Sequence, residues 1–295
     1  MFKSVIAGFM LVVATAQADT SLSNAKFVRL DRPYEVSGSV FADNRFYLVM
    51  DNQPAIYVLR NQTDNSVPSI HIDLTKLNGY ADYAENHEIN LEGIAHCSGV
   101  FYLANEKSND VLKVSAGKLE VLPIDKTYLV SKNPKKGLEG VAVDCKHQML
   151  FVAVQSYPQK VVVYKMRDSR YVTTFNLSGG VEDKNNNISD LSFLNDRLYV
   201  LQKNRTSILK ISVYGNKNEP ILERLDYSKY AYILDSNQLD AQGNTINKDF
   251  AEGLVVKGND YFLFYDQGKS GSISKKGQNL GLHLDSRGVV LQLSN

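Results

Sequence analysis

One pattern recurs five times along this chain and restricts the possible folds more than any other feature of the sequence. Each copy contains an apolar strand, a polar or Gly-containing turn and an aromatic-rich strand, a combination that predicts a β-hairpin. The copies are SGSVFADNRFYLVMD (37–51), EGIAHCSGVFYLANE (92–106), EGVAVDCKHQMLFVAVQ (139–155), SDLSFLNDRLYVLQK (189–203) and EGLVVKGNDYFLFYD (252–266). Such repetition indicates an array of similar structural units.

Shorter strand-like segments follow most of the hairpins. We expect third strands at 56–59, 111–114, 161–164 and 208–213, and fourth strands at 71–74, 119–123, 171–176 and 221–225. Four short antiparallel strands per repeat form the blade of a β-propeller. The sequence therefore predicts an all-β, five-bladed β-propeller, whose last blade is completed by 27–30 beside the strand at 289–293. A six-bladed propeller is the alternative, because 231–234 within the long segment 214–250 is apolar.

The first 18 residues have the pattern of a secretory signal peptide. Lys3 precedes a short apolar stretch at 5–13, and the sequence AQA at 16–18 fits a cleavage site. A retained interfacial anchor is the alternative. We expect cleavage to leave a single periplasmic or secreted domain, residues 19–295, that does not insert into the membrane and is a monomer. Loss of Lys3 lowers the formal net charge from +1 to 0, which argues against a nucleic-acid partner.

The two cysteines, Cys97 and Cys145, stand at equivalent ends of neighbouring repeats. In an oxidising compartment such a pair can form a disulfide. Two buried free thiols are the alternative. A zinc site would need more soft ligands nearby than the sequence offers.

Every repeat begins with a serine or a glutamate. Because the innermost strands of a propeller converge on its axis, we expect these first residues to surround one mouth of the central channel. Three carboxylates there would repel one another unless a cation lies between them or they take up protons. Oxygen ligands without His or Cys favour a hard ion, and calcium accepts a loose cage of oxygens. The sequence therefore predicts a calcium site formed by Ser37, Glu92, Glu139, Ser189 and Glu252.

The carboxylates of this ring of first residues have an alternative role without a metal, in which they cap backbone N–H groups or hold channel water. Asp190 stands at the second position of its repeat, where the other four repeats carry glycine, and it is a further candidate ligand.

A second set of candidate ligand-binding residues lies at or just beyond the last position of each repeat. Its basic members would clamp an anionic small molecule such as a phosphate, although ordinary surface charge is the alternative. The set is Asp51, Glu106, Lys107, Gln155, Lys203, Arg205, Asp266 and Lys269. We assign no role to the histidines at 71, 87, 96, 147 and 283, which show no metal-binding spacing.

The motifs NLEGIA (90–95), GLEGVA (137–142) and FAEGL (250–254), each followed by an aromatic strand, resemble the bacterial SdiA-regulated propeller family. They also resemble the neighbouring group with esterase-like phytase activity. The resemblance implies an exported or envelope propeller. This sequence departs from the pattern at Asp190, Gln155 and Lys203.

The order Ser, Glu, Glu, Ser, Glu is also similar to the calcium ring of the calcium-activated nucleotidases, or apyrases. That resemblance implies that the five first residues bind the metal and that the metal assists hydrolysis of a phosphate.

Two readings of function therefore remain. In the first, the protein is an envelope propeller that binds a ligand or partner, and calcium holds the blades together; the absence of a recognisable nucleophile or general base favours it. In the second, it is a calcium-dependent hydrolase of phosphate esters or anhydrides, which the acidic ring beside basic residues favours.

Overall fold

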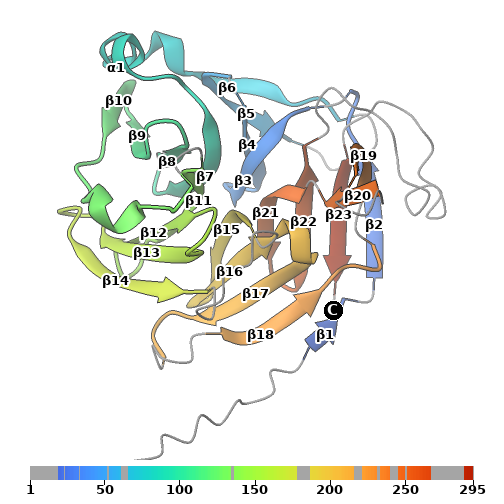
Figure 1. Ribbon diagram of the computed structural model, residues 1–295. Helices are drawn as coiled ribbons and strands as arrows, with labels where there is room; N and C mark the ends of the chain where they lie inside the picture. Colours follow the sequence, from blue (N-terminus) through green and yellow to red (C-terminus); the bar gives the residue numbers. More distant parts are fainter. Residues whose placement is uncertain are drawn as a thin grey trace, which may run out of the picture.

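Five four-stranded antiparallel sheets surround a central axis in the computed structural model, as Figure 1 shows. The five-bladed propeller expected from the repeats is confirmed. The structure describes residues 19–22, 24–32, 34–51, 53–60, 66–133, 136–177, 187–215, 221–230, 233–239, 245–249, 251–266 and 289–294. The expected signal peptide and Lys269 lie outside these residues. No helix within them is long and apolar enough to span a membrane.

Each blade begins with its innermost strand and runs outward. Blade 1 contains β3 (Val36–Ala42), β4 (Arg45–Met50), β5 (Ala55–Leu59) and β6 (Ser69–Asp73). Blade 2 contains β7 (Leu91–Cys97), β8 (Val100–Asn105), β9 (Asp110–Ser115) and β10 (Lys118–Val121). Blade 3 contains β11 (Leu138–Asp144), β12 (Met149–Val154), β13 (Lys160–Lys165) and β14 (Tyr171–Asn176).

The last two blades use strands from the beginning of the chain. Blade 4 contains β15 (Ile188–Leu194), β16 (Arg197–Gln202), β17 (Ser207–Ser212) and β18 (Ile221–Asp226), with β1 (Asp19–Ser21) added in parallel to β18. Blade 5 contains β21 (Ala251–Lys257), β22 (Asp260–Tyr265), β23 (Val289–Ser294) and β2 (Asn24–Arg29). The pairing of β2 with β23 closes the ring as expected, whereas the addition of β1 was not foreseen.

Short helical elements lie between strands. η1 (Leu74–Lys76) and α1 (Tyr80–Asn86) connect blades 1 and 2, and η2 (Lys126–Leu129) connects blades 2 and 3. η3 (Lys203–Arg205) lies within blade 4, between β16 and β17. A separate hairpin, β19 (Ile233–Leu239) with β20 (Thr245–Asp249), lies between blades 4 and 5 in the chain. Residues 233–234 of the apolar stretch therefore belong to a two-stranded hairpin, while 231–232 lie outside the described residues. The sheets form five blades, and the six-bladed alternative is wrong.

The hydrophobic core lies between blades. One buried cluster joins Tyr47 of blade 1 to Phe101 and Leu112 of blade 2, and another joins Leu201 of blade 4 to Leu263 of blade 5. Because each sheet buries both faces against its neighbours, packing between blades stabilises the ring more than any single blade could. A disulfide between Cys97 and Cys145, with a Cα–Cα distance of 5.7 Å, also links blades 2 and 3.

Candidate functional site

Each innermost strand contains a β-bulge at the first residue of its repeat. In blade 1, Val36 pairs with Met50 and Gly38 with Val49, so Ser37 has no residue directly opposite. The same shift in register occurs at the equivalent position of the other four blades. The bulge leaves the first residue unpaired in the ladder, and bulges commonly re-aim a side chain in this way.

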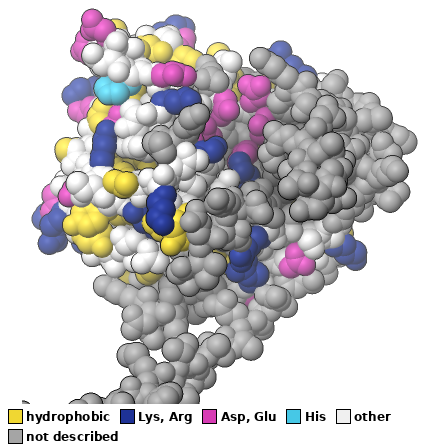
Figure 2. Space-filling model, in the orientation of Figure 1, with side chains coloured by type: hydrophobic (Ala, Val, Ile, Leu, Met, Phe, Trp, Pro, Cys, Tyr) yellow, Lys and Arg dark blue, Asp and Glu magenta, His cyan; other side chains and the backbone are white. Residues whose placement is uncertain are grey.

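The five first residues lie where they were expected, on the innermost strands, and all are buried. Ser37, Glu92, Glu139, Ser189 and Glu252 are each at most 9% exposed. We call this end of the channel, together with Asp51, Glu106 and Lys203, the acidic mouth. Figure 2 shows acidic side chains with basic ones beside them near the middle of one face of the molecule.

The carboxylates of the acidic mouth perturb one another. Burial raises the pKa of Glu92 well above its ordinary value, and the charges of Glu139, Asp51, Glu252 and Glu106 raise it further. Burial also raises the pKa of Glu139; Lys203 opposes this shift and Glu252 adds to it. These side chains are therefore close enough to act as one electrostatic group, although their oxygens do not all come within 4.8 Å of one another.

Lys203 supplies a positive charge inside this group. It begins η3, directly after β16, and its Nζ forms an ion pair with Oε1 of Glu252. The other carboxylate oxygen of Glu252, Oε2, is buried and has no hydrogen-bond partner among the described residues. Lys203 was expected to belong to an outer clamp for an anion, but its side chain is only 16% exposed and points into the ring of acids.

The two serines are already hydrogen-bonded within the mouth. Ser37 donates through Oγ to Oδ1 of Asp51, and Ser189 donates to the carbonyl oxygen of Ala251 at 2.9 Å. Each hydroxyl oxygen keeps lone pairs that can coordinate a cation.

The remaining outer residues divide into fixed and exposed groups. Glu106 accepts a hydrogen bond from Nδ2 of Asn90 at 3.0 Å, which holds it against blade 2. Gln155 is buried, and its Oε1 has no partner among the described residues. Asp51 and Asp266 are partly buried, while Lys107 and Arg205 are exposed. The structure thus brings Asp51, Glu106 and Lys203 to the acid group and leaves the exposed cations at its edge.

A narrow waist lies immediately beyond the acidic mouth. A Cβ on Gly93 would approach the carbonyl oxygen of Glu139 to 2.5 Å, so only glycine allows these strands to come so close. Gly38, Gly140 and Gly253 meet similar backbone or side-chain contacts.

Asp190 occupies the same position in blade 4 and fills the waist. Its carboxylate accepts hydrogen bonds from the backbone N–H groups of Leu254 at 2.7 Å, Leu191 at 2.8 Å and Ser39 at 3.3 Å, and so links β15 to β21 and β3. Burial raises its pKa well above the ordinary value even though these three N–H groups favour the charged form. The structure therefore gives Asp190 a bracing role across three blades.

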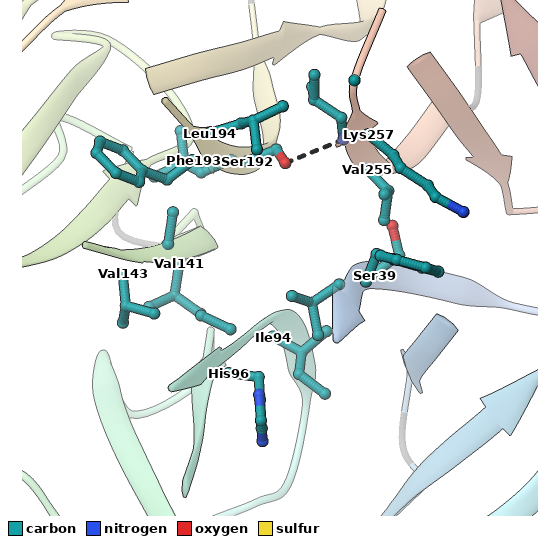
Figure 3. A pocket seen from close by; sticks show the side chains of 17 residues that line it. Ser39, Ile94, His96, Val141, Val143, Ser192, Phe193, Leu194, Val255 and Lys257 are labelled. Carbon is teal, nitrogen blue, oxygen red and sulfur yellow. Dashed lines mark hydrogen bonds between the residues drawn. The ribbon is translucent and has the colours of Figure 1, made fainter. Parts of the chain in front are cut away.

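On the other side of the waist, the channel widens into a cavity of ≈ 320 Å³. Ile94, Val141, Val143 and Val255 surround this cavity, and the Lys257 side chain extends away from it (Figure 3). Its walls are mostly apolar and offer no convergent charges, in contrast to the acidic mouth.

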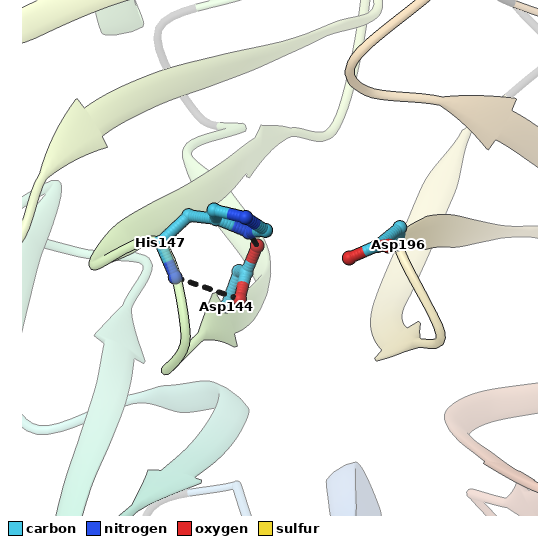
Figure 4. Close-up of side chains that lie close together, drawn as sticks. All are labelled: Asp144, His147 and Asp196. Atoms are coloured by element: carbon cyan, nitrogen blue, oxygen red, sulfur yellow. Dashed lines mark hydrogen bonds and ion pairs between the residues drawn. The ribbon is translucent and has the colours of Figure 1, made fainter.

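A second group of metal-ligating side chains lies at the hairpin turns, away from the mouth. One ligand atom each from Asp144, His147 and Asp196 lies within 4.8 Å of the others, the single such group among the described residues (Figure 4). Asp144 is buried, yet its carboxylate accepts from the His147 backbone N–H at 3.1 Å and from the Tyr214 hydroxyl, and it contacts Nδ1 of His147 at 2.7 Å. Burial acts to raise the pKa of Asp144, but these hydrogen bonds outweigh it and lower the pKa.

Asp196 comes from a different blade, so no spacing of residues along the sequence indicates this group. Since Asp144 already has partners at both oxygens, hydrogen bonding explains the group without a cation.

Comparison with known proteins identifies a family and a related fold. The sequence pattern of the phytase-like family, described as "Esterase-like activity of phytase", matches residues 35–264. No curated protein sequence matches the chain. The crystal structure of Myxococcus xanthus glutaminyl cyclase superimposes with a TM-score of 0.54 at 12% identity, covering 94% of this chain and 100% of that one. At this identity the likeness shows the fold alone.

Two further structures superimpose more loosely. A nidogen/laminin complex gives a TM-score of 0.46 at 14% identity, covering 79% of this chain and 72% of that one. A streptogramin B lyase gives a TM-score of 0.45 at 11% identity, covering 92% of this chain and 98% of that one.

Proposed function

Because this chain belongs to the phytase-like family, we propose that it binds calcium at the acidic mouth and hydrolyses a phosphate ester there. The observation that carries the proposal is the burial of three glutamates around one lysine at a single end of the channel. Carboxylates that repel one another this strongly favour a cation between them.

The residues present fit a hard divalent cation. Oε2 of Glu252 is buried without a hydrogen-bond partner among the described residues, which is costly unless a ligand satisfies it. The donor set consists of oxygens alone, as calcium prefers. Glu92, Glu139 and Glu252 would hold the ion, with the hydroxyls of Ser37 and Ser189 as further ligands. Bound there, the ion would orient a phosphate and offset its negative charge.

The protein's own residues supply the proton transfer. In the reaction a water oxygen attacks phosphorus, the bond to the ester oxygen breaks, and the alcohol leaves with a proton. Glu106 belongs to the acidic mouth but not to the proposed set of ligands, so its carboxylate would take the proton from that water. Lys107 and Arg205, exposed beside the mouth, would bind the outer phosphate oxygens.

Phosphate release from phytate, a nucleotide and p-nitrophenyl phosphate tests the proposal. We expect turnover with calcium and none after chelation, and a loss of about 100-fold or more in Glu139→Gln, as is usual when an acid–base or charge-stabilising group is removed. Glu120→Gln, on the outer strand β10, is the matched control and should retain full activity. Lack of turnover on every phosphate ester in calcium would refute the hydrolase.

A binding propeller without catalysis is the second candidate. The hydrogen bonds of Ser37 and Ser189 favour it, because they join neighbouring segments within the mouth and suit a structural ion. In that case calcium would raise the melting temperature and an anionic ligand or envelope partner would bind, with no product formed.

We also propose that the protein is exported to the periplasm or secreted. The signal-like sequence at 1–18 and the Cys97–Cys145 disulfide support this location. Sequencing the mature N-terminus after expression should yield Asp19; an uncut Met1 in a cytoplasmic fraction would contradict it.

A further inference from the structure

Lys203 is the one departure from an otherwise acidic or amide position. The last residue of the repeat is Asp51, Glu106, Gln155 and Asp266 in the other blades. Only in blade 4 does this position carry a positive charge, and that charge is turned inward onto Oε1 of Glu252.

Lys203 is enclosed by the acids of the mouth. Its side chain is only 16% exposed, its Nζ pairs with Oε1 of Glu252, and Glu139 and Glu92 lie close enough to attract its charge. If Glu92, Glu139 and Glu252 are ionised, Lys203 reduces the charge of these three side chains from −3 to −2. The nearby carboxylates of Asp51 and Glu106 add further negative charge, so the mouth still attracts a divalent cation.

Lys203 and a cation would compete for the same carboxylate. While Nζ holds Oε1 of Glu252, only Oε2 of that glutamate has no partner among the described residues. A cation that takes Glu252 weakens the hold on the amine, and a like charge nearby opposes the cation. The flexible four-carbon stem of a lysine lets the freed ammonium turn to another anion.

We propose that Lys203 is an internal counter-ion: it limits calcium affinity when no ligand is present and pairs with the phosphate of the ligand once calcium is bound. The inference rests on the proposed calcium site and adds a residue that sets the affinity and specificity of that site. Removal of Lys203 should therefore shift calcium affinity and phosphate affinity in opposite directions.

The test compares Lys203→Met with the wild-type protein by calorimetric titration. The first titration adds calcium alone to metal-free protein, and the second adds inorganic phosphate at saturating calcium. We expect calcium to bind the variant at least about tenfold more tightly, since a unit charge close to the ion is removed. Phosphate should bind at least about tenfold more weakly, because a charged donor is lost.

Two further variants separate an effect of charge from an effect of packing. Lys203→Arg keeps the charge and should bind calcium within about twofold of wild type. A packing defect that does not depend on charge would change the calcium affinity of Lys203→Arg as well. Lys118→Met removes an exposed lysine on the outer strand β10 and should change calcium affinity less than about twofold, because exposed charges are screened.

Unchanged or weaker calcium binding in Lys203→Met, with calcium still binding the wild type, would overturn this inference and leave the proposed function standing. Unchanged phosphate affinity in Lys203→Met would overturn the proposed pairing of Lys203 with the phosphate of the ligand. If calcium binds none of these proteins, the calcium site itself is wrong, and the inference falls with it.

Discussion

Replacing Asp190 should destabilise the ring, although four other blades manage with glycine at this position. In Asp190→Ala, three backbone N–H groups on three strands lose their acceptor. A buried donor without a partner costs about 1–3 kcal/mol. Removing the carboxylate also removes its own cost of burial, which offsets part of the loss. We therefore expect the free energy of unfolding to fall by about 3 kcal/mol.

The conservative variant separates hydrogen bonding from packing. Asp190→Asn keeps one carbonyl oxygen, which can still accept from Leu254 and Ser39, but its NH₂ group would face the N–H of Leu191. We expect a smaller loss, about 1–2 kcal/mol. Asp190→Gly restores the residue that neighbouring blades carry and should still be as unstable as Asp190→Ala.

Urea unfolding at neutral pH measures these differences. Because the chain has no Trp and 17 Tyr, tyrosine fluorescence and far-ultraviolet circular dichroism are the suitable probes. The reasoning fails if Asp190→Ala unfolds within about 0.5 kcal/mol of wild type, the range of an unremarkable surface substitution, or if the glycine variant is more stable.

Three further predictions concern the waist, the acid group and the disulfide. Gly93→Ala should lower the free energy of unfolding by at least about 2 kcal/mol, because its Cβ would overlap backbone atoms of blade 3. Gly99→Ala, which has open space but a φ of +79°, should lower it by only about 1 kcal/mol through backbone strain, and equal melting curves for the two variants would contradict this. In chelator, stability should fall as pH rises above the ordinary glutamate range, because the raised pKa values of Glu92 and Glu139 favour the protonated, folded form at low pH. Calcium should flatten this dependence, and a melting temperature that rises with pH in chelator would refute the electrostatic explanation. Reduction should lower the free energy of unfolding by about 4 kcal/mol, the loop-closure value for a crosslink spanning 48 residues, and the Cys97→Ala/Cys145→Ala variant should no longer respond to reductant.

The repeats predicted the architecture because each hairpin carries its own strand and turn signals. The outward order of the strands, the closing role of 27–30 and the place of all five first residues on the innermost strands followed from aligning the copies. The alignment could not reveal the bulge at each first residue, because innermost strands buried on both faces show no apolar–polar alternation for a one-residue shift to interrupt. The parallel addition of β1 to β18 depends on a contact between distant segments and left no local signal.

The candidate site was predicted in outline, and its charge balance was not. Three acids at equivalent positions indicated one acidic mouth, but the inward turn of Lys203 depends on the short helix η3 that follows β16. The departure of Asp190 was visible as a break in the pattern, yet its three backbone partners come from different blades. Asp144, His147 and Asp196 likewise come together only through the ring.

Calorimetric titration of calcium into wild type, Glu139→Gln and His147→Ala tests the central claim most directly, because it separates the acidic mouth from the second group of ligating side chains. We expect one calcium ion to bind wild type and His147→Ala alike, and binding to be lost in Glu139→Gln. Calcium binding that survives in Glu139→Gln but is lost in His147→Ala would place the ion at the hairpin turns and contradict the account.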